Sequence, residues 1–137
     1  MKSRRILYIS QEINPYLPES DISLTARRLP QGIQELGNDI RIFMPRFGMI
    51  NERRNQLHEV IRLSRINMII NNNDHPLIIK VASLPTARLQ VYFIDNDDFF
   101  QRKSLFDPEP KGENDNDERS IFFVRGALET VKKLRWI

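Results

Sequence analysis

Carboxylate and carboxamide side chains recur at a few positions of this chain where they could bind a polar ligand. Asp95 and Asn96 follow directly after an apolar segment, and Asp115 and Asn116 form a second such pair further along. Glu12 follows another short apolar run. Carboxylate oxygens accept hydrogen bonds, and carboxamides both donate and accept them. These five residues are therefore the candidates for contact with a polar ligand.

Each candidate also has a structural interpretation, which stays open beside the functional one. Aspartate and asparagine after a strand commonly form turns, which would explain Asp95 and Asn96 without a ligand. Asp115 and Asn116 are followed by a predicted helix and can cap it. Glu12 can hold a loop by accepting backbone hydrogen bonds.

The residue types predict no metal site and no bound cofactor. The chain contains no cysteine, which excludes disulfides and thiolate ligands, and its two histidines, His58 and His75, are isolated. Because His75 precedes Pro76 in a turn-rich stretch, we expect its side chain to be exposed to solvent.

Length and charge narrow the class of protein. A chain of 137 residues is expected to form a single domain, here residues 1–137. The net charge of +3 comes from 21 basic and 18 acidic residues that are dispersed, which argues against a nucleic-acid partner. No apolar stretch approaches the roughly 20 residues needed to cross a membrane, and the start lacks the apolar run of a signal peptide. We expect a cytoplasmic protein.

The first third of the chain predicts a strand, a helix and a second strand. Residues 6–9 form a continuous apolar run, as in a central parallel strand that is covered on both faces. Residues 40–44, which are apolar except for Arg41, form the second predicted strand and are followed by Pro45. Ser20 or Ser23 can cap the intervening helix, and Gly37 can end it. Its expected apolar face consists of Leu29, Ile33 and Leu36, with Pro30 causing a kink or a late start.

The rest of the chain predicts further strands and a last helix. Residues 60–63, 66–70, 77–81 and 89–94 are rich in β-branched residues, with a strong turn at 71–76 and a weaker one at 85–88. They fit an inserted antiparallel hairpin and a strand that returns to the main sheet. After an exposed loop at 101–114, a helix should run from 115 to about 134, with apolar residues at Ile121, Phe122, Val124, Leu128 and Val131.

These elements together predict an α/β fold. It is a Rossmann-like domain of three layers, with a mainly parallel sheet and an inserted antiparallel β-hairpin. In such folds ligands bind outside the carboxyl ends of the strands, where Glu12, Asp95 and Asn96 are expected.

Five segments of the chain carry recognisable motifs: residues 11–16, 29–41, 44–48, 92–96 and 115–123. In their order and approximate spacing they resemble the glycogen and starch synthase family, with the greatest similarity to the branch found in Bacteroides-like bacteria. Any one motif has little specificity, but five in the same order are specific, and they cover nearly the whole chain.

The resemblance implies the amino-terminal half of a GT-B glycosyltransferase. Members of the family transfer glucose from a nucleotide sugar, ADP-glucose or UDP-glucose, to an α-1,4-glucan with retention of configuration. Glu12, Asp95, Asn96, Asp115 and Asn116 would then lie on the side of the α-glucan acceptor. The family's carboxy-terminal donor-binding domain would have to complete the site, so residues 1–137 are expected to be one part of the enzyme, inactive alone and without an assigned catalytic residue.

One segment departs from the family. Where the family has a lysine and glycines that approach the diphosphate, this chain has Pro18, Glu19, Ser20 and Asp21. Two carboxylates would repel a diphosphate. A free-standing glucan-binding or regulatory module without catalysis is therefore the alternative. A different Rossmann-like nucleotide-binding protein is disfavoured, because no glycine-rich phosphate loop follows the first strand.

Overall fold

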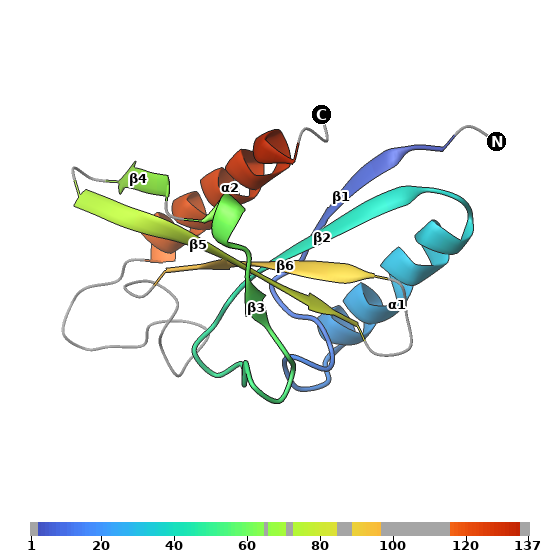
Figure 1. The fold of residues 1–137 in the computed structure, drawn as a ribbon. Coiled ribbons are helices and arrows are strands. Elements are labelled where there is room, and N and C mark those ends of the chain that lie inside the picture. Colours follow the sequence, from blue (N-terminus) through green and yellow to red (C-terminus); the bar gives the residue numbers. More distant parts are fainter. Residues whose placement is uncertain (1–2, 65, 71–72, 85–88, 97–115, 135–137) are drawn as a thin grey trace.

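The computed structural model describes residues 3–64, 66–70, 73–84, 89–96 and 116–134, with only the backbone of 116 and 117 (Figure 1). The predicted turn at 85–88, the loop at 101–114 and the candidate Asp115 lie outside these residues. The elements are β1 (Arg5–Ile9), α1 (Asp21–Glu35), β2 (Asp39–Pro45), β3 (His58–Glu59), the 3₁₀ helix η1 (Ile61–Leu63), β4 (Ile66–Ile70), β5 (Asn73–Ser83), β6 (Gln90–Asp95) and α2 (Asn116–Lys133).

The strands form a mixed sheet in the order β1-β2-β6-β5-β3, and β4 pairs with β5 outside this path. β1, β2 and β6 are parallel, with Ile6 beside Ile40 and Ile42 beside Val91. β5 runs antiparallel to β6, β3 and β4. The predicted α/β fold, its inserted hairpin and the return of β6 to the parallel sheet are confirmed.

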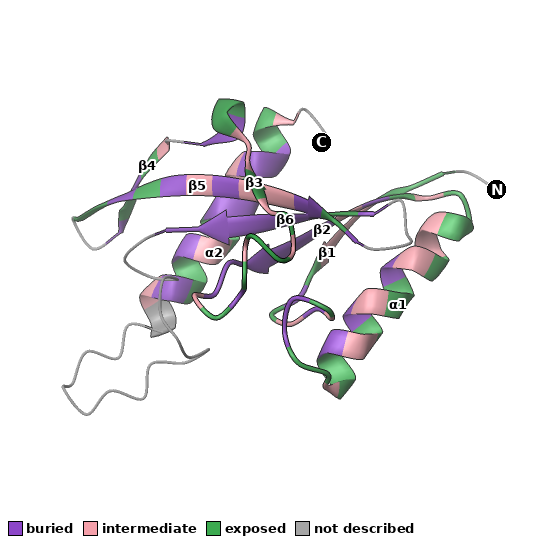
Figure 2. Cartoon of the chain, turned by 60° about the horizontal axis from the view of Figure 1, so that its bottom comes forward, coloured by how far each residue is buried: buried purple, intermediate pink, exposed green. Residues whose placement is uncertain are grey.

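Helical and loop segments cover both faces of the central strands. In α2, a Cβ atom placed on Gly126 would lie 2.8 Å from Cγ2 of Ile94. Tyr16, just before α1, packs edge-on against Phe93 with ring centroids 5.0 Å apart. Because Phe93 and Ile94 are successive residues of β6, they point to opposite faces of the sheet. α2 therefore covers one face, and the segment leading into α1 lies on the other (Figures 1 and 2).

Helix α1 begins where its capping residues predict. Ser20 is the N-cap, and its Oγ accepts a hydrogen bond from the backbone N–H of Ser23 while Ser23 Oγ accepts one from the N–H of Ser20. The chain leaves the helix at Gly37, whose φ of 97° suits glycine. A late start after Pro30 is excluded, because Pro30 lies inside the helix and is buried.

The face that α1 buries differs from the predicted one. Leu29 and Leu36 are exposed, and the buried residues are Ser23, Ala26 and Pro30. Of the predicted face only Ile33 packs against the core, where it is partly buried. The residues on the buried side follow one another at spacings of three and four and so share one face of the helix, and the two leucines lie on another face. The same correction applies to α2, where Phe122 and Val131 are buried but Ile121, Val124 and Leu128 are about half exposed.

Three other expectations were wrong. β1 is an edge strand among the described strands, and none of its residues is buried, although its sequence predicted a central, covered strand. Residues 60–63 contain η1 instead of a strand. His75 is buried and packs edge-on against Phe122, because β5 already begins at Asn73 and turns His75 toward α2.

Candidate functional site

The candidate residues gather at one edge of the sheet, where the parallel strands β1, β2 and β6 all end. Glu12 follows β1, and Asp95 ends β6. The start of α2 reaches the same edge, because the guanidinium carbon of Arg119 lies 5.6 Å from the ring centre of Phe47, which follows β2. Asn116 is the first residue of α2, and Asn96 directly follows Asp95. Four of the five candidates therefore lie in this region.

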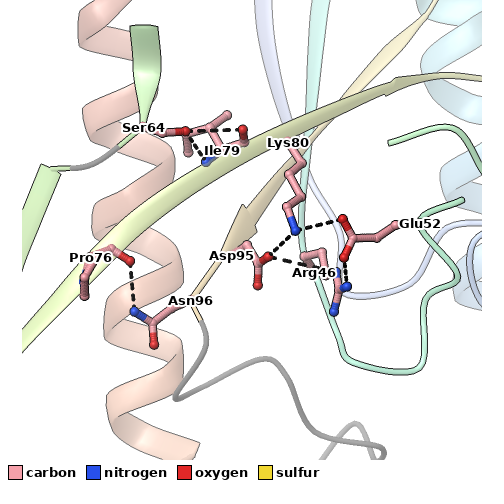
Figure 3. Close-up of polar contacts among 8 residues, drawn as sticks. All are labelled: Arg46, Glu52, Ser64, Pro76, Ile79, Lys80, Asp95 and Asn96. Atoms are coloured by element: carbon pink, nitrogen blue, oxygen red, sulfur yellow. Dashed lines mark hydrogen bonds and ion pairs between the residues drawn. The ribbon is translucent and has the colours of Figure 1, made fainter. Parts of the chain in front are cut away.

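A cluster of four charged side chains lies at this edge, and we call it the charge cluster: Arg46, Glu52, Lys80 and Asp95 (Figure 3). The Nζ atom of Lys80 lies 2.9 Å from Oδ2 of Asp95 and 2.7 Å from Oε1 of Glu52. Arg46 pairs with Glu52, and its Nε lies 3.9 Å from Oδ2 of Asp95. The cluster thus joins the segment after β2 to β5 and β6.

Burial explains why these charges are paired. The side chain of Asp95 has no exposed surface, and that of Arg46 is 7% exposed. An isolated charge in such a place is strongly unfavourable, whereas a paired and hydrogen-bonded one is tolerated. In this arrangement Asp95 offers its carboxylate to Lys80 and has no surface for a ligand. Its predicted contact with substrate stays a prediction, and the geometry favours a positioning role.

Sequence reasoning did not identify Arg46, Glu52 or Lys80 as members of a site. Arg46 and Glu52 lie in the segment after β2 and Lys80 lies in β5, and only the pairing of β2 with β6 and of β6 with β5 brings them together. One signal was present, because Lys80 interrupts the apolar strand Leu77, Ile78, Ile79 and Val81. A charged residue inside an apolar strand requires a partner.

Asn96 also makes a contact within the protein. Its side chain is buried, and Nδ2 donates a hydrogen bond to the carbonyl oxygen of Pro76 at 2.9 Å (Figure 3). This bond attaches the end of β6 to β5, as a structural role would require. The predicted contact of Asn96 with an acceptor sugar stays a prediction.

Glu12 lies half-buried between the end of β1 and the start of α1. Its Oε1 accepts a hydrogen bond from the hydroxyl of Ser20 at 3.2 Å. Ser10 Oγ donates to the carbonyl oxygen of Glu12 at 2.8 Å, which shapes the turn after β1. The partner of the carboxylate is thus the N-cap side chain. A carboxylate has about four acceptor sites, so the hydrogen bond from Ser20 leaves acceptor capacity for a ligand.

The segment that departs from the family is held by its own side chains. Ser23 is fully buried, and its Oγ donates to the carbonyl oxygen of Pro18 at 3.0 Å. Glu19 and Asp21 are exposed at the start of α1. Their negative charges lie near the positive end of the helix dipole, where an anionic ligand would otherwise be favoured.

Tyr16 is a further polar group near this edge. It is buried, and its hydroxyl has no hydrogen-bond partner among the described residues. Burial raises the pKa of Tyr16 to about 12, and the positive charge of Arg27 acts in the opposite direction. Tyr16 is therefore neutral at physiological pH and packs as an aromatic residue.

The described residues contain no group of three or more histidine, cysteine or carboxylate side chains that could hold a metal ion. None of the helices in this part of the chain is long and apolar enough to cross a membrane.

Comparison with known proteins gives consistent matches. The profile of the starch synthase catalytic domain matches residues 5–137. A glycogen synthase of Chlorobium phaeobacteroides is 37% identical over 134 residues, which cover 96% of this chain and 27% of that protein. A glycogen synthase of Chlorobium luteolum is 38% identical over 138 residues, covering 98% of this chain and 28% of that protein.

A solved structure shares the fold. The catalytic domain of starch synthase IV from Arabidopsis thaliana, bound to ADP and acarbose, superposes with a TM-score of 0.77 at 20% identity. The match covers 96% of this chain and 26% of that one. The chain spans about a quarter of the length of the curated relatives that it matches.

Proposed function

The chain belongs to the starch synthase catalytic domain family, and from this premise we propose that it is the acceptor-side portion of a glycogen synthase-like glucosyltransferase. The match of residues 5–137 to the family profile carries this proposal. The parent protein would transfer glucose from a nucleotide sugar, ADP-glucose or UDP-glucose, to an α-1,4-glucan in the cytoplasm. Residues 1–137 would form one part of that longer protein and pair with a carboxy-terminal donor-binding domain.

The carboxyl edge of the sheet is the proposed place of glucan contact. Glu12 has acceptor capacity there, and Asn116 begins the helix that reaches the same edge. Asp115 would contribute beside it. Asp95 and Asn96 would act by holding the ends of β5 and β6 together, through Lys80 and Pro76 respectively. We assign no catalytic residue to the chain.

A calorimetric titration tests this function. The purified chain is titrated with maltoheptaose, with ADP-glucose and with UDP-glucose, and glucose transfer to glycogen is measured in parallel. We expect weak binding of maltoheptaose and no turnover. Binding of a nucleotide sugar without any binding of glucan would contradict the acceptor-side assignment.

One observation favours a second function, that of a glucan-binding or regulatory module without catalysis. Glu19 and Asp21 are exposed where the resemblance places the diphosphate contact, and they oppose an anionic donor. Assays of glucose transfer and glucan binding on the polypeptide that the intact gene encodes distinguish the two functions. Glucose transfer by that polypeptide supports the enzyme, and glucan binding without transfer supports the module.

A further inference from the structure

A row of large apolar side chains lies exposed along α2, and we call it the α2 seam: Ile121, Val124 and Leu128. Their exposed fractions are 47%, 49% and 50%. Residues three and four positions apart are neighbours on a helix surface, so the three side chains form one continuous row. The sequence predicted that they would face the core together with Phe122 and Val131, but only the latter two are buried. Contiguous apolar surface of this kind is typical of interaction sites.

The α2 seam points away from the sheet. The Cβ position of Gly126 lies 2.8 Å from Cγ2 of Ile94, so this side of the helix faces β6. Val124 precedes Gly126 by two residues, which is about 200° around the helix axis. The buried side chains of Phe122 and Thr130 lie four residues on either side of Gly126 and share its orientation. Figure 2 shows exposed and buried residues alternating along α2, as expected of a helix with one buried side.

The shape of the α2 seam suits another helix. Its three side chains extend over about two turns of a helix of 18 residues. A narrow apolar row at spacings of three and four is the pattern through which helices pack side by side. A strand presents a side chain to one face at every second residue, which does not match this spacing. The occupant that fits is therefore a helix with a similar apolar row, and α2 of a second copy supplies one.

Charges near the two ends of α2 favour a second copy in the antiparallel orientation. If two copies of α2 cross at the middle of the seam, Ile121 of each lies beside Leu128 of the other. Glu118 then lies within one residue of the position beside Lys132 of the second copy, and two-fold symmetry forms this opposite-charge contact twice. In a parallel pair the same two residues are 14 positions apart, or about 21 Å along the axis.

The charges that flank the seam are compatible with this pairing. Glu118, Arg125 and Lys132 are seven residues apart and therefore lie on the same side of the row. Lys132 is 63% exposed, and its contact with Glu129 of its own helix, at 3.6 Å, is weak, so Lys132 can exchange that partner. Arg125 lies near the middle, where two copies would repel each other. Its Nη1 donates to the carbonyl oxygen of Ile69 at 3.0 Å, which draws the guanidinium toward β4.

We propose that the α2 seam binds a second copy of this chain, through two antiparallel α2 helices related by a two-fold axis beside Val124. The inference goes beyond the proposed function and does not depend on it, because it uses only the surface of α2. Each copy contributes a single helix to the contact, so the interface is small and the dimer is weak and concentration-dependent.

Single cysteines test the contact, because the chain contains no cysteine of its own. Val124→Cys places a thiol beside the proposed axis, and we expect it to form a disulfide-linked dimer on mild oxidation. Leu29→Cys is the matched control, since Leu29 is 48% exposed on α1, and it should stay monomeric. Equal yields of dimer from the two variants, or no dimer from Val124→Cys, overturn the proposal.

A mixture of two further variants determines the orientation of the helices. Ile121→Cys and Leu128→Cys are oxidised separately and then together. Antiparallel helices predict a disulfide-linked dimer in the mixture only, whereas parallel helices would link each variant to itself. Dimers of the separate variants without an added dimer in the mixture contradict the proposed arrangement.

Sedimentation equilibrium measures the reversible association of the chain without a disulfide. Leu128→Lys should weaken the dimer by at least about tenfold, because it removes buried apolar surface from both copies. Leu29→Lys should leave association unchanged. Lys132→Glu should weaken the dimer by about fivefold, since two ion pairs are lost, and adding Glu118→Lys should restore it. Circular dichroism checks that each variant folds. Unchanged association of folded Leu128→Lys overturns the proposal.

The longer polypeptide that the intact gene encodes tests the occupant. Val124→Cys in that polypeptide should again give a dimer, with the disulfide located at position 124 by peptide mapping. A dimer of the chain alone but a monomer of the longer polypeptide means that another part of the parent covers the seam, and the proposed occupant is then wrong. A chain that stays monomeric at every concentration also overturns the proposal.

Discussion

The ammonium group of Lys80 lies 2.9 Å from the carboxylate of Asp95, and this ion pair joins β5 to β6 beside the carboxyl edge of the sheet (Figure 3). Asp95 has no exposed surface, while 15% of the Lys80 side chain is exposed. The second carboxylate, Glu52, approaches Lys80 from the segment after β2. Strand ends and the adjoining loop are thus held in one arrangement by buried charge.

The first prediction concerns this ion pair. Lys80→Met removes the closest cation from a buried carboxylate, and we expect the free energy of unfolding to fall by about 3 kcal/mol. Urea denaturation followed by circular dichroism measures the change. The matched control is Lys132→Met, because Lys132 is 63% exposed and pairs with Glu129 at 3.6 Å on the helix surface. That loss should stay below about 0.5 kcal/mol, and equal losses would contradict the role of burial.

The second prediction concerns the contact of α2 with the sheet. In Gly126→Ala the new Cβ would lie 2.8 Å from Cγ2 of Ile94 and 3.0 Å from Cδ1 of Leu77. We expect a destabilisation of about 1–3 kcal/mol from overpacking, in spite of the better helix propensity of alanine. Gly32→Ala in α1 is the control, because nothing lies within 4 Å of its Cβ position. It should stabilise the protein by up to about 1 kcal/mol; a gain at both positions would show that α2 packs less closely.

The third prediction concerns alkaline pH. The pKa of Tyr16 is raised to about 12 from an ordinary value of 10.0, so the folded state keeps a proton that the unfolded state loses in this range. The unfolded state therefore binds fewer protons, and stability falls as pH rises from about 10 to 12. Denaturation midpoints across this range should fall less steeply in Tyr16→Phe. An unchanged slope in that variant would assign the pH dependence to other groups.

The fourth prediction separates binding from folding at the turn after β1. Glu12→Gln keeps an oxygen that can accept the Ser20 hydroxyl but removes the charge, so stability should change little while the affinity for maltoheptaose falls. Ser20→Ala removes the N-cap of α1 and should cost about 1 kcal/mol of stability with little change in glucan affinity. Calorimetry and urea denaturation measure the two effects. A loss of stability alone in Glu12→Gln would leave Glu12 with a purely structural role.

Local sequence predicted most of the elements, with the exception of residues 60–63, but not which of their residues are buried. Ser20 or Ser23 and Gly37 predicted the bounds of α1, and Ser20 is the N-cap. Capping and a positive φ depend on neighbouring residues only. The same sequence did not predict that Leu29 would be exposed, because the face that a helix buries depends on the shape of the sheet beneath it. His75 was misplaced for the same reason, since Phe122 approaches it from a distant helix.

In the candidate site, too, local sequence predicted where the residues lie along the chain but not which residues they contact. The position of Asp95 and Asn96 at the end of a strand followed from the apolar segment before them, and the parallel pairing of β2 and β6 confirmed that location. Their partners could not be predicted, because Lys80 and Pro76 become neighbours only when β5 folds back onto β6.

The sequence by itself determined the main strands and helices, the family and the set of polar residues that follow the strands, although residues 60–63 contain η1 and not the predicted strand. These depend on periodicity, on caps and on short motifs, all of which are local. Only the tertiary structure decided that Asp95 is buried against Lys80, that α1 buries its small residues, and that β1 lies at an open edge. Long-range pairing sets these features, since burial and ion pairing depend on which segments meet in space.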